Sequence, residues 1–156
     1  MMLKSLVLAT AVVCALVVPA ARMSDEVKPD LTGVKCMLMP KKEVKETFSV
    51  DYAGSKVYFC CKGCAGNFSK DPEKHGTAAN KQLVDTKLFK QAACPISGGK
   101  LNDATEIEVD GTKVKFCCNN CKGKVEGEKD ATAKSALVFA KDAFAKGFAK
   151  VEPKKE

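Results

Sequence analysis

The sequence has 156 residues, nine of them cysteines, and a formal net charge of +7. This length allows one domain or two small ones and excludes a large two-domain enzyme. Because His75 is the only histidine, a metal centre built on several histidines is also excluded. The number of cysteines indicates that the thiols act together, either as disulfide pairs or around metal ions.

Residues 1–20 are predicted to be a signal peptide. Lys4 supplies a positive start, residues 6–18 form an apolar or small run, and Ala20 and Ala21 offer a cleavage site. The run is shorter than the roughly 20 residues that a membrane-spanning helix needs. We therefore expect a protein that is exported to the periplasm or the cell exterior and does not span the membrane. Cleavage would remove Cys14 and leave eight cysteines.

The rest of the chain contains an internal repeat. Residues 54–66 and 111–123 are identical at eight of 13 positions, at a constant offset of 57. Upstream, Cys36 and Cys94 correspond at an offset of 58. The eight remaining cysteines therefore divide into two sets of four, each with one early cysteine followed, about two dozen residues later, by Cys-Cys-x-x-Cys.

Each copy is predicted to form a β-hairpin followed by a short helix. In the second copy, residues 105–109 and 112–116 alternate polar and apolar side chains on either side of an Asp-Gly turn. Residues 44–50 and 56–60 repeat this pattern in the first copy. The double cysteine ends each returning strand, and the segments that follow it are predicted to be helical, at 62–70 and 119–126.

A strand that runs directly into a helix places the cysteines of each copy at a helix N-terminus. There the helix dipole and the free backbone N–H groups lower the pKa of a thiol and favour thiolate. We therefore expect the Cys-Cys-x-x-Cys segments to carry the chemistry of the chain.

Two further helices are predicted outside the repeat. Residues 77–92, with Ala79, Leu83, Val84 and Leu88 at helical spacing, should link the copies, and residues 130–150 should form a C-terminal amphipathic helix. A charged tail follows at 151–156. The expected fold class is α+β, with two hairpin–helix modules at 35–76 and 93–128.

Three cysteines of each copy suit a tetrahedral zinc site. Cys60 and Cys64 bracket the junction of strand and helix, and Cys36 must return from before the hairpin to close the site. The second copy repeats this arrangement with Cys94, Cys117 and Cys121.

The fourth ligand is left open by the sequence. Cys61 and Cys118 are candidates, but neighbouring residues of an extended strand point to opposite faces. His75 is a candidate in the first copy, where the matching position of the second copy is Thr132.

The motifs of the two copies resemble those of the YHS and TRASH-like treble-clef modules. The resemblance rests on the early cysteine in 36–40, the Gly-Lys hairpin and Phe-Cys-Cys in 54–64, and the Phe and Asp-Pro in 68–74. Residues 94–98 and 116–121 carry it in the second copy. It implies binding of copper, zinc or another soft metal, with six cysteines as ligands: Cys36, Cys60, Cys64, Cys94, Cys117 and Cys121.

Three classes of function follow. The favoured class is an exported protein that binds about two ions of zinc or another soft metal such as copper, since thiolates select Zn²⁺ and Cu⁺ over hard cations. The second is a disulfide-stapled structural or interaction module, and the third is a thiol-disulfide oxidoreductase that uses Cys-x-x-Cys. A nucleic-acid partner is not expected, because the positive charge is mostly lysine and is spread along the chain.

Overall fold

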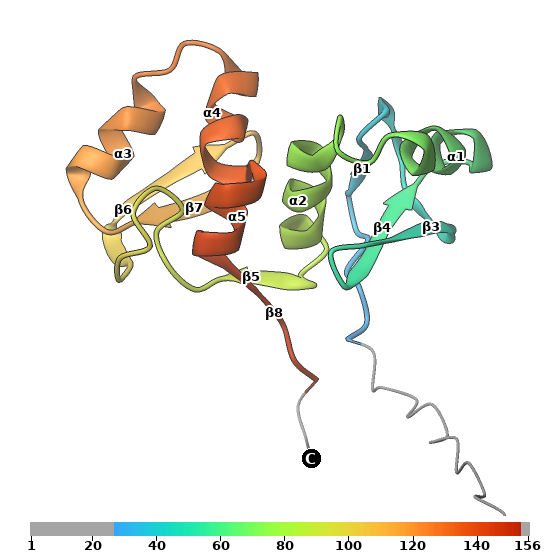
Figure 1. Ribbon diagram of the computed structural model, residues 1–156, viewed down its shortest axis with the longest axis horizontal. Helices are drawn as coiled ribbons and strands as arrows, with labels where there is room; N and C mark the ends of the chain where they lie inside the picture. Colours follow the sequence, from blue (N-terminus) through green and yellow to red (C-terminus); the bar gives the residue numbers. More distant parts are fainter. Residues whose placement is uncertain (1–26, 154–156) are drawn as a thin grey trace, which may run out of the picture.

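Two hairpin–helix units, one from each copy of the repeat, lie on either side of three central helices (Figure 1). The computed structural model describes residues 27–153. The predicted signal peptide and the last three residues of the predicted tail lie outside this range. The fold is α+β, as the sequence predicts.

The first unit consists of two antiparallel strand pairs and a helix. Its elements are β1 (Lys35–Cys36), β2 (Met39–Glu43), β3 (Lys45–Tyr52), β4 (Ser55–Phe59) and α1 (Lys62–Lys70). The predicted hairpin is β3–β4, whose turn residues Ala53 and Gly54 both have positive φ, as a tight two-residue turn requires. The β1–β2 pair, which presents Cys36, is not anticipated by the sequence pattern.

The second unit repeats the predicted hairpin and helix. Its elements are β6 (Asn102–Val109), β7 (Thr112–Phe116) and α3 (Asn119–Glu126). Asp110 and Gly111 form the turn, again with positive φ at both residues. Cys94 lies in a tight loop, in which its C=O accepts from Gly98 N–H at 2.7 Å and its N–H donates to Gly99 C=O at 2.9 Å.

Each helix packs on its hairpin through one fully buried apolar residue. Phe68 of α1 lies against Phe59 at the end of β4, with ring centroids 5.2 Å apart. Val125 of α3 and Phe116 of β7 are the fully buried residues at the matching places of the second unit. These contacts hold the first turn of each helix beside the end of the returning strand, where the cysteines lie.

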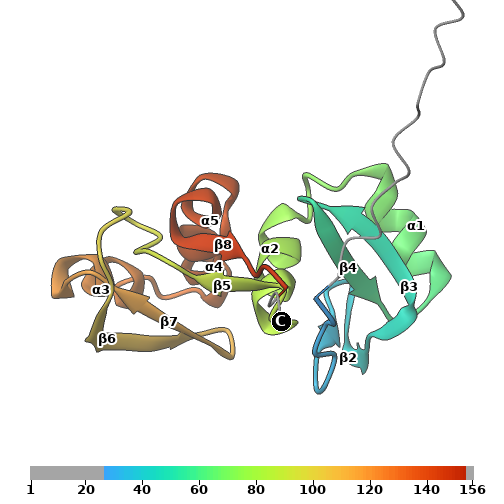
Figure 2. The same cartoon turned by 90° about the horizontal axis from the view of Figure 1, so that it is seen from below.

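The centre of the molecule is helical. Its elements are α2 (Gly76–Asp85), α4 (Ala131–Phe139) and α5 (Lys141–Gly147), joined by the antiparallel pair of β5 (Phe89–Gln91) and β8 (Phe148–Lys150). Figure 2 shows α2 beside α4 and α5, between the two hairpins. Asn80 of α2 donates to the C=O of Phe139 at 2.8 Å and fixes this contact.

The predicted linker helix is shorter than the sequence indicates. It ends at Asp85, where the buried Thr86 hydroxyl donates to Gln82 C=O at 2.8 Å and Lys87 takes a left-handed conformation with φ of 60°. The residues beyond it form β5 instead, because they pair with β8, almost 60 residues further along the chain.

Two helices and a strand replace the single C-terminal helix that the sequence predicts. Ala140 is extended, with ψ of 155°, and separates α4 from α5. The bend gathers Phe139, Phe144 and Phe148 into one buried group, with ring centroids of neighbouring pairs 5.2 and 5.6 Å apart. Val151, the first residue of the predicted tail, donates its N–H to Leu88 C=O at 2.9 Å.

A glutamine side chain from the central region clamps the edge of each hairpin. Gln82 of α2 accepts from Tyr58 N–H at 2.7 Å and donates to Tyr58 C=O at 2.8 Å. Gln91 of β5 makes the same two hydrogen bonds to Lys115, at 2.9 and 2.6 Å. The two units are therefore held to the centre through equivalent residues of β4 and β7.

Candidate metal centre

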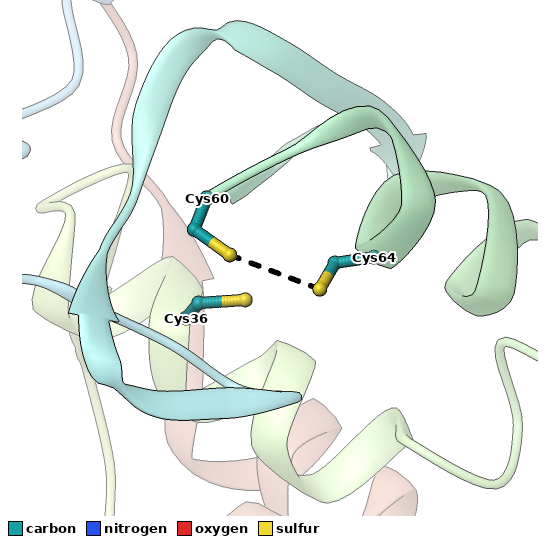
Figure 3. A group of neighbouring side chains, drawn as sticks. All are labelled: Cys36, Cys60 and Cys64. Carbon is teal, nitrogen blue, oxygen red and sulfur yellow. Dashed lines mark hydrogen bonds between the residues drawn. The ribbon is translucent and has the colours of Figure 1, made fainter.

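Three thiols of the first unit converge on one point. Cys36 at the end of β1, Cys60 after β4 and Cys64 in the first turn of α1 have Sγ atoms that all lie within 4.8 Å of one another (Figure 3). All three residues are buried, with exposed fractions of 0, 7 and 6%. The structure thus brings together the three residues that the sequence predicts, and we call them the first cluster.

The second unit repeats this arrangement. Cys94, Cys117 and Cys121 have Sγ atoms within 4.8 Å of one another, and we call them the second cluster. Cys94 and Cys121 are buried, whereas Cys117 is half-buried. The predicted residues come together here as well.

The spacing of the sulfur atoms fits a shared metal ion. Sulfur ligands at about 2.3 Å from a tetrahedral zinc ion lie about 3.8 Å from each other. The Sγ atoms of Cys60 and Cys64 are 3.8 Å apart, and those of Cys117 and Cys121 are 3.6 Å apart. A disulfide would need about 2.05 Å, and all eight cysteines within residues 27–153 are free thiols. The clusters therefore fit a thiophilic ion held by three sulfurs.

The early cysteine of each cluster is surrounded by backbone N–H groups. Burial is the largest single influence on Cys36 and opposes its ionisation, but the N–H groups of Cys60, Leu38 and Met39 together lower its pKa below the ordinary value. Hydrogen bonds to the charged form stabilise a thiolate.

Cys94 has the same surroundings at matching positions. Burial again opposes ionisation, while the side chain and N–H of Ser97, followed by the N–H groups of Cys117 and Ile96, lower its pKa to about 7. Both copies thus have the same set of donors. They lie two and three residues after the early cysteine and at the cysteine that ends the returning strand. In both copies these hydrogen-bond donors favour the thiolate form of the early cysteine.

The cysteine in the helix has the opposite tendency. Burial raises the pKa of Cys64 to about 12, with further contributions from the neighbouring thiols, and does the same for Cys121. A second and third negative charge in such a cluster is unfavourable without a cation. A bound cation would supply that charge, which is why the arrangement suits metal thiolates.

The second cysteine of each double cysteine stands outside its cluster. Cys61 and Cys118 are the N-cap residues of α1 and α3, and both have extended backbone, with φ of −159° and −160°. The N–H group of Cys64 is the main cause of a lowered pKa at Cys61, and the N–H group of Cys121 is the main cause at Cys118. Their thiols thus face the helix ends, although Cys118 Sγ still lies 3.6 Å from Cys117 Sγ.

His75 is not part of the first cluster. It precedes α2 and places its ring beside that of Phe68, with centroids 6.4 Å apart. Its position is that of a residue packed at the start of a helix.

Ser97 contacts the second cluster and was not singled out from the sequence. Its Oγ lies 3.1 Å from Cys117 Sγ, where either group can be the donor, and accepts from Gly99 N–H at 3.2 Å. The offset of 58 places Met39 at the same position in the first copy. The repeat aligned through Cys36 and Cys94 exposes this difference, which is the only sequence signal that could have found it.

Comparison of the chain with protein-family models, curated proteins and solved structures found no match. Within residues 27–153, no helix has both the length and the apolar character needed to cross a membrane.

Proposed function

We propose that this chain is a tandem metal-binding protein that holds one soft metal ion, zinc or copper(I), in each cysteine cluster. The observation that carries the proposal is the convergence of three thiols at equivalent places in both units, at separations that match ligands of one ion. Thiolate ligands select these metals over hard cations.

The resemblance to YHS and TRASH-like modules supports the same proposal. The cysteines in the two clusters are the six that the resemblance implies as ligands. With the apolar segment at 6–18 as an export signal, we propose that the protein sequesters or carries metal in the periplasm or outside the cell.

Native mass spectrometry of the chain without residues 1–20, purified without added metal, tests the proposal together with a count of reactive thiols. Two bound ions are expected, with six to eight thiols protected from alkylation until a chelator is added. A metal-free mass lower by about 2 Da for each pair of cysteines would instead assign the disulfide-stapled class. Complete pairing would have to include Cys61 and Cys118, which lie at the helix N-caps outside the clusters, so the geometry favours metal.

A thiol-disulfide oxidoreductase is the second candidate, and the Cys-x-x-Cys geometry is its specific support. Cys61 is half-buried at a helix N-terminus with a lowered pKa, and Cys64 behind it is buried with a raised pKa. Oxidoreductases pair a reactive thiolate with a resolving thiol in this way. Reduction of insulin by the metal-free, reduced protein tests this activity, and a rate no greater than that of free dithiothreitol would remove it.

A further inference from the structure

We propose that the two clusters have different tasks: the second exchanges its metal ion with an external thiol-containing acceptor, whereas the first retains its ion. This inference rests on the proposed metal binding. It adds which of the two clusters gives up its metal ion, a property that the equivalent ligands of the two clusters do not determine.

The first argument is the exposure of the thiols. All three residues of the first cluster are at most 7% exposed. In the second cluster Cys117 is half-buried, and its neighbour Cys118 is exposed, whereas the matching Cys61 is half-buried. An acceptor must touch the metal or a ligand to take the ion, and only the second unit offers an exposed thiol there.

The second argument is the residue that lies over Cys117. Gly99 approaches so closely that a Cβ atom there would lie 3.2 Å from Cys117 Cβ and 3.6 Å from its Sγ. Glycine places no side-chain atom on the thiol at this position, and Cys117 is half-buried. The early-cysteine offset places Lys41 at the matching position of the first copy.

The third argument is the contact between the two neighbouring thiols. Cys118 Sγ lies 3.6 Å from Cys117 Sγ, a separation that one metal ion can bridge. Transfer would begin when the Cys118 thiolate bonds to the metal as the bond from the metal to Cys117 breaks. Thiols of the acceptor would then lose their protons to solvent and replace the protein ligands one at a time, and the released cysteines would take up protons. The oxidation state of the metal does not change.

Removal of zinc by a chromophoric chelator tests this inference on the Zn²⁺-loaded chain. We expect two phases, with one ion in each. N-ethylmaleimide added during the fast phase, followed by peptide mass mapping, identifies the cluster that opens first. The expected order is modification of Cys117 and Cys121 before Cys60 and Cys64.

Two matched substitutions make the test specific. Cys118→Ser should abolish the fast phase, so that both ions leave slowly, without lowering the number of ions bound. Cys61→Ser, the equivalent change in the first unit, should leave both phases as they were. Early modification of Cys60 and Cys64, or equal effects of the two substitutions, would overturn the inference. A chain that binds neither zinc nor copper(I) would overturn the proposed function and this inference with it.

Discussion

Ser97 is the side chain that most clearly distinguishes the second cluster from the first. Its Oγ accepts from Gly99 N–H and lies 3.1 Å from Cys117 Sγ. Groups that hydrogen-bond to metal ligands typically contribute a factor of about 10–100 to metal affinity. We therefore expect Ser97→Ala to weaken zinc binding to the second cluster by about this factor in a two-site competition titration.

The control for this substitution is Ser69→Ala. Ser69 is exposed on α1, and its hydroxyl donates to the C=O of Ala65 at 3.0 Å, away from both clusters. This change should leave both affinities unaltered. Equal zinc affinities for Ser97→Ala and the unmodified chain would show that the hydroxyl does not tune the cluster.

The buried helix cysteines predict a dependence of metal affinity on pH. Cys64 and Cys121 have pKa values of about 12 in the metal-free structure, so each carries a proton at neutral pH. A metal ion binds the thiolate and releases that proton, so affinity must rise with pH by about tenfold per unit for each proton released. The number of protons released on zinc addition is measured with a pH indicator in weak buffer, and zinc affinity is measured at several pH values. Affinity that stays constant between about pH 6 and pH 8 would contradict it.

At the scale of elements, α5 is placed to hold the loop of the second cluster. The C=O of Gly147 accepts from Ala92 and Ala93 N–H at 2.8 and 3.0 Å, just before Cys94. A Cβ at Gly147 would lie 2.9 Å from the Cα of Pro95. Overpacking of this kind costs about 1–3 kcal/mol, so Gly147→Ala should lower stability in a urea titration and weaken metal binding at the second cluster alone.

Gly123→Ala is the matched control for this prediction. Gly123 lies inside α3 and has nothing within 4 Å of a Cβ built on it. Alanine should therefore stabilise the helix by roughly 0.5–1 kcal/mol. If Gly147→Ala were as well tolerated, the close approach to Pro95 would not constrain the site.

Gln82 and Gln91 both bond to a hairpin, but replacing them should lower the stability of the protein by unequal amounts. Gln82 is only 4% exposed, so water cannot readily replace its two hydrogen bonds to Tyr58. Loss of two such bonds at about 0.5–1.5 kcal/mol each should make Gln82→Ala less stable by about 1–3 kcal/mol. Gln91 is half-buried, so water can replace its bonds and Gln91→Ala should cost less. Urea denaturation of the two variants measures this difference. Equal losses in the free energy of unfolding would contradict the prediction.

The elements that the sequence predicts correctly are those fixed by local signals. Both hairpins follow from alternation around a tight turn, and α1 and α3 have the predicted bounds because each follows a strand directly. The pair β5–β8 was missed because its partners are distant in sequence. The break at Ala140 was missed because neither glycine nor proline marks it, and burial of phenylalanines on both sides decides it.

At the scale of the whole molecule, the duplication made the candidate site predictable. The repeat divides eight cysteines into two equivalent sets of four, and the structure brings the same three members of each set together. Differences between the copies depend on the loop around Cys94 and on the exposure of Cys117 and Cys118. Aligning the copies shows the residue changes at Ser97 and Gly99, but the exposure of Cys117 and Cys118 depends on three-dimensional packing, which the alignment does not contain.

The cysteines of the two clusters lie on separate hairpins and helices, on either side of the central helices (Figure 1). Each should therefore bind its ion independently. In units this small, a bound ion also adds stability that the apolar core alone supplies only in part.

The number of ions bound by single-cluster variants tests the central claim most directly. Native mass spectrometry should find two ions on the unmodified chain and one on each of Cys64→Ser and Cys121→Ser. Loss of both ions from either substitution would contradict independent sites, and two ions retained by both variants would contradict the assignment of these cysteines as ligands.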